Sequence, residues 1–266
     1  MPDGLEGAAF TPGGDTAAPE RRWWGRHLSE SRWQLEYARL LADPIHGGFG
    51  IPHGDGSPVL LIPGFLAGDA SLANMARWLK RIGYSPRRSG ITVNVDCSDT
   101  ALDRLTKRLW TIHRQTGRAV ALLGHSRGGH FAKALASRCP DKVSQVISLG
   151  AGLDKPYDIS LPTKATVSGV RSILARAERG NGQGSCLTET CACSFVRDYD
   201  APFPADVPLT SIYTRGDGVV WWEACVVPYA RNVEVRGSHI GLAFNRHAYR
   251  VIAETLAADV PGFGER

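Results

Sequence analysis

The chain of 266 residues lacks several features that would place it in a specialised class of protein. It contains no apolar run long enough to span a bilayer. Its 31 lysines and arginines are scattered, so the net charge of +5 indicates solubility and weak attraction of anions, and nucleic-acid binding is not expected. It has neither a phosphate-binding loop nor a paired C-x2-C zinc pattern, so we expect no cofactor and no metal ion.

The composition is that of an ordinary globular protein, with 43% hydrophobic and 21% charged residues. A chain of this length can fold as one α/β domain around a single sheet. Residues 1–20 are rich in Gly, Pro, Ala and Asp, and they lack the basic start and apolar centre of a secretory signal. We therefore predict a flexible tail over 1–20, a single domain over 21–266, and a cytoplasmic location.

The six cysteines fall into two groups. Cys97 and Cys139 are isolated and are expected to be buried thiols. The other four lie late in the chain: Cys186, Cys191, Cys193 and Cys225. The spacing C-x4-C-x-C is not a zinc pattern and has no histidine nearby in sequence, so a local disulfide or simple packing is favoured over a metal site. Sequence alone fixes neither their pairing nor their redox state.

The most informative segment is residues 124–128, which read Gly-His-Ser-Arg-Gly. They follow the apolar run 119–123 and precede the helix-like segment 129–136. The order strand, Gly-x-Ser-x-Gly, helix is the context in which the pattern indicates a nucleophile elbow, because the glycines leave room for a sharp and strained turn. The alternative is a chance turn of small residues. We predict that Ser126 is held above the sheet edge as a nucleophile.

Apolar runs and helical stripes alternate along most of the chain. Strands are predicted at 59–62, 91–95, 119–123, 143–149, 209–214 and 232–236. Helices are predicted at 23–41, 69–82 with Asp69 as cap, from about 98–100 to Gly117, 129–136, 167–177 and 247–258. In the first helix Glu30 and Glu36 interrupt the apolar residues, which favours packing on the outside of the core over a membrane-surface role. The alternation predicts an α/β fold, a mostly parallel sheet with helices on both faces.

One interval breaks the alternation. Between Asp154 and Pro208 only one helix is predicted, around 167–177. A structureless stretch of this length is unusual inside a compact domain, so we expect a lid or cap insertion over about 155–207. Its place after the strand that follows the elbow puts it above the carboxyl edge of the sheet, where ligands of α/β sheets bind.

A serine hydroxyl needs a histidine base, and the base needs a carboxylate. His239 follows the last predicted strand and should lie at the same sheet edge as Ser126. Asp217 follows the preceding strand, between two glycines, and is the leading candidate for the acid, with Asp154 as the alternative. The chain order serine, acid, histidine is that of α/β-hydrolases.

The negative charge of a tetrahedral intermediate needs two hydrogen-bond donors. The backbone N–H of Arg127 is one, since an elbow presents the amide that follows its nucleophile. The second is expected from Phe65, in the turn Pro63-Gly64-Phe65 after the first strand, where Gly64 lets the backbone approach closely.

These pieces resemble those of bacterial lipases and esterases of the α/β-hydrolase superfamily. The likeness rests on the 63–65 turn, the 124–128 elbow, and the segments 211–220 and 237–239, within a region running from about Pro58 to the end. The resemblance implies the α/β-hydrolase fold and carboxylic-ester hydrolysis through an acyl-enzyme, with Ser126 attacking, His239 moving the proton and Asp217 orienting the imidazole. The chain departs from many relatives in having Pro63 where they place a histidine.

Apolar residues beside the expected site loops predict a pocket for an apolar acyl group, so the expected partner is a small-molecule ester. The candidates are Leu66, Leu153, Trp221, Trp222 and Ile240, although core packing explains some of them equally well. An acyltransferase or thioesterase would use the same three side chains. A peptidase is less favoured, and a non-catalytic binding protein on the same scaffold is a further alternative.

Overall fold

Six parallel strands form one sheet in the order β2-β1-β3-β4-β5-β6 in the computed structural model, which describes residues 30–177 and 193–258. The strands are β1 Pro58–Ile62, β2 Ser85–Arg88, β3 Val120–His125, β4 Val143–Leu149, β5 Leu209–Tyr213 and β6 Arg231–Glu234. Every neighbouring pair is parallel. The carboxyl ends of the strands therefore meet at one edge, where the loops that follow β1, β3, β5 and β6 come together.

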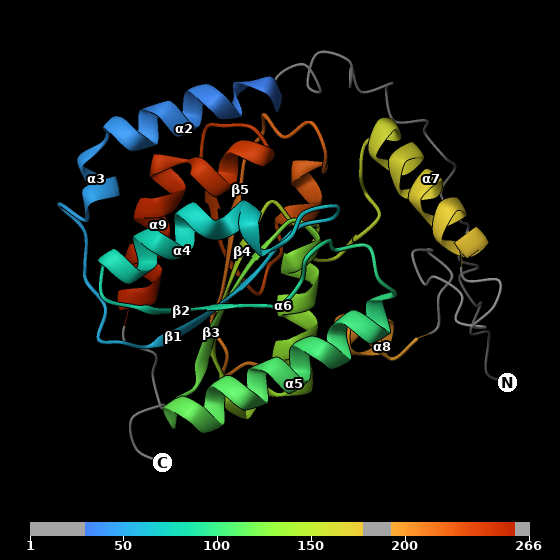
Figure 1. Cartoon of the computed structure of the whole chain (residues 1–266), viewed down its shortest axis with the longest axis horizontal. Coiled ribbons are helices and arrows are strands. Elements are labelled where there is room, and N and C mark those ends of the chain that lie inside the picture. The colour runs from blue at the N-terminus through green and yellow to red at the C-terminus, as the bar shows by residue number, and fades with distance from the viewer. Residues whose placement is uncertain (1–29, 178–192, 259–266) are drawn as a thin grey trace, which may run out of the picture.

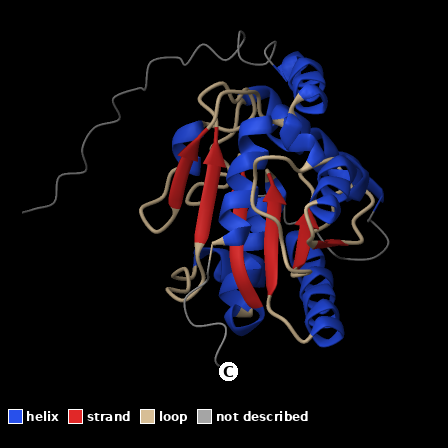
Figure 2. Ribbon diagram, turned by 90° about the vertical axis from the view of Figure 1, so that its left-hand side faces the viewer, coloured by secondary structure: helices blue, strands red, loops and turns tan. Residues whose placement is uncertain are grey.

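Helices cover both faces of this sheet (Figures 1 and 2). The helices are α2 Trp33–Ala42, α3 Pro44–Gly47, α4 Ala73–Arg81, α5 Ser98–Thr116, α6 Arg127–Arg138, α7 Leu161–Ala177, α8 Ser194–Asp200 and α9 Arg246–Ala257. Alternate residues of β1 enter different cores: Leu60 and Ile62 pack with α5, α6 and α8, whereas Val59 and Leu61 pack with α2, α3, α4 and α9. This period of two is what a strand buried on both faces requires. The predicted α/β fold is confirmed.

The strand predicted at 91–95 is wrong. The edge strand is instead β2, whose sequence Ser-Pro-Arg-Arg is polar and is half-buried or exposed. Its Pro86 is tolerated because an edge strand leaves part of its backbone unpaired. Residues 91–95 run beside the loop after β1, and Asn94 exchanges backbone hydrogen bonds with Leu66 and Ala67 at 3.3 and 2.8 Å. This segment packs against the site rather than entering the sheet.

One capping prediction is wrong. The helix predicted from Asp69 starts with a short 3-10 turn, Asp69–Leu72, and continues as α4. Asp69 does not cap it, because its carboxylate accepts from the backbone of Ser89 and Gly90. At the N-terminal end, the described part of the predicted 23–41 helix is the 3-10 turn Glu30–Arg32 followed by α2. The tail predicted over 1–20 lies outside the described residues.

The predicted insertion divides into two parts. Helix α7 stands apart from both helical layers (Figure 1), and the large side chains of Leu161 and Ile173 are exposed. Helix α8, which was not predicted, packs on α5 and α6, with Phe195 and Tyr199 buried in the core. Residues 194–200 therefore belong to the helical layer rather than to a lid.

Among the cysteines, Cys97 differs from expectation, whereas Cys139 is the buried thiol that was predicted. Cys97 is disulfide-bonded rather than an isolated thiol. Cys139 and Cys225 are buried thiols, and Cys193 is a thiol that hydrogen-bonds Asp99. The partner of Cys97 is not among the described cysteines, and the predictions for Cys186 and Cys191 lie outside the described residues. No helix in the described part of the chain is long and apolar enough to cross a membrane.

Candidate functional site

Ser126 occupies a strained turn between β3 and α6, with φ 53° and ψ −124°. The two flanking glycines are required by close backbone contacts. A Cβ on Gly124 would lie 2.2 Å from the carbonyl oxygen of Gly128, and a Cβ on Gly128 would lie 2.1 Å from that of Ile62. Positive φ at a residue with a side chain is costly and persists only where the surroundings enforce it. The predicted elbow geometry is present, and the serine side chain is partly accessible at the carboxyl edge of the sheet.

Asp217 and His239 form a buried hydrogen-bonded pair. Asp217 follows β5 and His239 follows β6, and the distance from His239 Nδ1 to Asp217 Oδ2 is 2.7 Å. The other carboxylate oxygen, Oδ1, accepts from the backbone N–H groups of Val219 and Val220 at 2.8 and 2.7 Å. The Asp217 carboxylate is therefore held by its own loop while it contacts the imidazole, and Nε2 is the imidazole nitrogen that does not contact it.

Gly150, after β4, makes room for this pair. It has a φ of 59°, and a Cβ there would lie 2.8 Å from Leu242, 3.1 Å from His239 Nδ1 and 3.3 Å from Asp217 Oδ2. A larger residue would be strained by its backbone angle and would press on the pair.

The electrostatic environment shifts the pKa values of the two histidines at this edge in opposite directions. Burial lowers the pKa of His239, but the charge and hydrogen bond of Asp217 and the charge of Glu30 outweigh it, and the net pKa lies above the usual value. Burial and the neighbouring His239 lower the pKa of His125 to about 4. His125 is thus neutral near pH 7, and its Nε2 lies 3.0 Å from the carbonyl oxygen of His239. It supports the histidine loop.

The alternative acid, Asp154, is not near the imidazole. Its side chain is exposed and accepts a hydrogen bond from the hydroxyl of Tyr229 at 2.8 Å. Of the two candidates, only Asp217 contacts His239.

The loop after β1 lies directly against the elbow. A Cβ on Gly64 would be 3.1 Å from the Cβ of Ser126, so Phe65 is brought beside the serine. Within the described residues, the backbone N–H of Phe65 donates no hydrogen bond. The next residue, Leu66, has a φ of 60°. The backbone of Arg127 follows the serine at the start of α6, so both predicted donors border the same space.

A network of side chains braces this loop. The Arg127 guanidinium donates to the backbone and side-chain oxygens of Asn94 at 3.1 and 2.9 Å. It also donates to Asp96 O at 2.7 Å and Ser98 Oγ at 3.2 Å. Asn94 Nδ2 donates in turn to Pro63 O at 2.8 Å. Sequence reasoning assigned a role only to the Arg127 amide; the guanidinium ties the elbow to the loop after β1.

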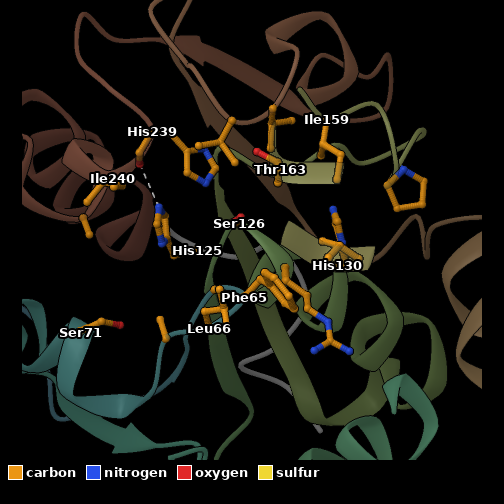
Figure 3. A pocket seen from close by; sticks show the side chains of 18 of the residues that line it. Phe65, Leu66, Ser71, His125, Ser126, His130, Ile159, Thr163, His239 and Ile240 are labelled. Atoms are coloured by element: carbon orange, nitrogen blue, oxygen red, sulfur yellow. Dashed lines mark hydrogen bonds between the residues drawn. The ribbon is translucent and has the colours of Figure 1, made fainter. Parts of the chain in front are cut away.

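Ser126 and His239 border one cavity of about 420 Å³ (Figure 3). Most of its wall is apolar, formed by Phe65, Leu66, Pro156, Ile159, Val167, Phe195, Val219, Val220, Ile240 and Phe244. Ser126 Oγ and His239 Nε2 are not joined by a hydrogen bond in the described part of the chain. Such contacts are often long in a free enzyme and tighten when substrate binds.

Two of the five predicted pocket residues line the cavity, Leu66 and Ile240. The other three do not. Leu153 is fully buried in the hydrophobic core, in the cluster that also contains residues of α5, α6 and α8. Trp222 stacks on Tyr213, with ring centroids 5.8 Å apart, and Trp221 is also outside the lining. Both tryptophans were predicted because they are close to Asp217 in sequence. Closeness in sequence does not determine where a side chain points.

Two residues that support the loops of this site were missed. The carboxylates of Glu30 and Glu36 are buried and accept hydrogen bonds from the loops around Asp217 and His239. The sequence offered one signal: Glu36 lies on the core-facing stripe between Trp33 and Leu40 at helical spacing. Among the described residues, no group of three or more His, Cys, Asp or Glu side chains could hold a metal ion.

No protein-family model and no curated protein sequence matches the chain. Solved structures do match. The mature form of the Bacillus licheniformis lipase BlEst2 is 16% identical with a TM-score of 0.55, and the match covers 78% of this chain and 94% of that one. A metagenome-derived lipolytic enzyme of the LipS and LipT pair is 13% identical with a TM-score of 0.52 over 78% and 94%. An esterase from a marine microorganism is 14% identical with a TM-score of 0.51 over 77% and 97%.

These structures share their overall fold with this chain. At such low identity the likeness concerns architecture, and the chemistry has to be argued from the side chains. The protein has the fold of the α/β-hydrolase superfamily.

Proposed function

We propose that the protein is a serine hydrolase that cleaves carboxylic esters. One observation carries the proposal: the strained Ser126 and His239, whose imidazole is hydrogen-bonded to the buried Asp217, border the same cavity. The chain order of the three residues is that of α/β-hydrolases. The structural likeness to lipases and esterases supports the same reaction class.

The reaction proceeds in two halves. Ser126 Oγ attacks the ester carbonyl carbon while His239 Nε2 takes its proton, and Asp217 stabilises the imidazolium that forms. The N–H groups of Phe65 and Arg127 bind the negatively charged oxygen. His239 gives the proton to the leaving alcohol oxygen, which leaves an acyl-enzyme. A water molecule then attacks the acyl carbon, His239 takes its proton and returns it to Ser126 Oγ, and the acid is released.

The cavity favours an apolar acyl group. Its wall is largely aliphatic and aromatic, and a pocket of this kind binds apolar groups by removing them from water. Residues 155–177 act as the cap over it, since Ile159, Thr163 and Val167 from this segment line the space. The cytoplasmic location stays a prediction, and the disulfide at Cys97 is a feature more typical of oxidising compartments.

The test is a series of p-nitrophenyl esters from acetate to octanoate, measured on the natural protein, Ser126→Ala and Ser137→Ala. Ser137 is the matched control, because it lies on α6 outside the cavity and its hydroxyl donates to Lys133 O at 3.3 Å. We expect Ser126→Ala to lower kcat by roughly three orders of magnitude or more, and Ser137→Ala to change it little. Equal rates in all three proteins would overturn the proposal.

Product analysis with added alcohol, and a thioester substrate run in parallel, distinguish the related activities. Release of free acid shows hydrolysis. Transfer of the acyl group to the alcohol as the main product would make the protein an acyltransferase, and a strong preference for the thioester would make it a thioesterase.

A further inference from the structure

Glu30 joins the two loops that carry Asp217 and His239. Its carboxylate is buried and accepts three backbone N–H groups. Oε1 accepts from Gly218 at 2.9 Å and from His239 at 3.0 Å, and Oε2 accepts from Ile240 at 2.9 Å. These partners lie 188 to 210 positions further along the chain. One side chain from before the first strand therefore sets the spacing between the acid loop and the base loop.

Among the described residues, no cationic side chain contacts this carboxylate. Within the described part of the chain Glu30 forms no ion pair, and its side chain is almost fully covered. Burying a charge is costly unless it is hydrogen-bonded, and charge-assisted bonds to N–H groups offset that cost. The physical consequence is a fixed negative charge beside the imidazole. Thr214 also connects the loops, with its hydroxyl 3.0 Å from Gly237 O, but it brings no charge.

Glu36 provides a comparison within the same segment. Its Oε1 accepts from the backbone and hydroxyl groups of Ser238, both at 2.9 Å, and Oε2 accepts from Asn245 at 3.3 Å. A Cβ on Gly241 would lie 2.2 Å from Glu36 Oε2. Glu36 thus holds the base loop on its far side and contacts neither the acid loop nor the backbone of His239.

We propose that Glu30 is a positioning residue for the His239–Asp217 pair: it holds the base loop against the acid loop, and its charge stabilises the protonated imidazole. The effect on catalysis rests on the proposed function. The effect on the imidazole exists without substrate and can be measured separately.

Four titratable groups surround the His239 imidazole and its loop. Asp217 faces it from the loop after β5, His125 from the end of β3, Glu30 from the first 3-10 turn and Glu36 from α2. Burial lowers the pKa of His239, and the charges of Asp217 and Glu30 raise it. His125 is uncharged near pH 7 because its pKa is about 4. Removing the charge of Glu30 removes one of the raising contributions, so the pKa of His239 falls.

The experiment follows the imidazole NMR signals of the natural protein, Glu30→Gln and Glu36→Gln as a function of pH. The His239 signal is assigned by its loss in His239→Gln. The two glutamine variants are matched: each removes one buried charge from the same segment and leaves one donor without its acceptor. We expect the titration midpoint of His239 to move to lower pH in Glu30→Gln, and by less in Glu36→Gln. No displacement in Glu30→Gln, or an equal one in both variants, overturns the proposal.

Kinetics provide the second readout. In Glu30→Gln the acid limb of kcat/KM against pH should move to lower pH, and kcat should fall about tenfold with little change in KM, since a small displacement of a base lowers kcat. An unchanged pH profile overturns the proposal. Absence of ester hydrolysis in every protein would contradict the proposed function, while the NMR comparison still decides the role of Glu30.

Glu30→Asp is the variant to test if Glu30→Gln does not fold. It keeps the charge, but its side chain is one methylene shorter and cannot reach both loops. We expect kcat to fall while the His239 midpoint stays closer to that of the natural protein than to the usual value. Unchanged kcat overturns the positioning role.

Discussion

The nucleophile side and the base side of the cavity are held by different kinds of contact. Around Ser126, backbone packs on backbone, and a Cβ at Gly124 or Gly128 would lie within 2.2 Å of a carbonyl oxygen. Around Asp217 and His239, the loops are joined by hydrogen bonds to side chains from distant parts of the chain. A steric contact of this kind leaves no space for even one added methyl group. Hydrogen bonds to charged groups can be weakened gradually, and their strength depends on pH.

The largest effect on stability is expected from a methyl group on the nucleophile side. In Gly128→Ala the new Cβ would meet the carbonyl oxygen of Ile62 at 2.1 Å, so we expect the free energy of unfolding to fall by about 3 kcal/mol. Gly169→Ala in α7 is the control, because its Cβ meets open space and alanine favours a helix by about 1 kcal/mol. Urea denaturation measures both. Similar stability of the two variants would show that the elbow is not sterically constrained.

The next effect concerns the base side. Asp217→Asn should lower kcat by roughly three to four orders of magnitude, because the amide no longer stabilises the imidazolium. Asp154→Asn should leave kcat within about twofold, since that carboxylate is exposed and bonds Tyr229. Steady-state kinetics with one ester decides. A comparable loss in both variants would move the acid away from Asp217.

The smallest effect is expected from the cavity wall, which requires neither tight backbone packing nor hydrogen bonds to charged groups. Val167→Ala removes apolar contact from the cavity, so kcat/KM for an octanoate ester should fall relative to acetate by roughly three- to tenfold. Val170→Ala on the same helix is the control, because Val170 does not line the cavity. An unchanged ratio in Val167→Ala would place the acyl group elsewhere.

Much of the nucleophile side could be predicted from the sequence, since its constraints are local. The elbow needs a strand, two glycines and a helix in immediate succession, and all of these lie within residues 119–136. Likewise β4 has the predicted bounds, Val143–Leu149, because its apolar residues are continuous. The polar edge strand β2 carries no such pattern and was missed.

The base side could be predicted in part. Asp217 and His239 were found from chain order and from their position after successive strands, but nothing in the spacing decided between Asp217 and Asp154. The direction in which a side chain points could not be predicted either, as Trp222 illustrates. It is close to the acid in sequence, but it stacks on Tyr213 and does not enter the cavity.

The sequence by itself determined the alternation of strands and helices, the elbow at Ser126 and the order of the three catalytic candidates, since these depend on periodicity and neighbouring residues. Only the tertiary structure decided which carboxylate contacts His239, which apolar side chains line the cavity, and that Glu30 bridges two loops about 200 positions away. Backbone N–H groups are the same at every position. A side chain that accepts hydrogen bonds from them requires no particular residue type at the donor positions. Such contacts therefore cannot be recognised in the sequence and are found only in the folded structure.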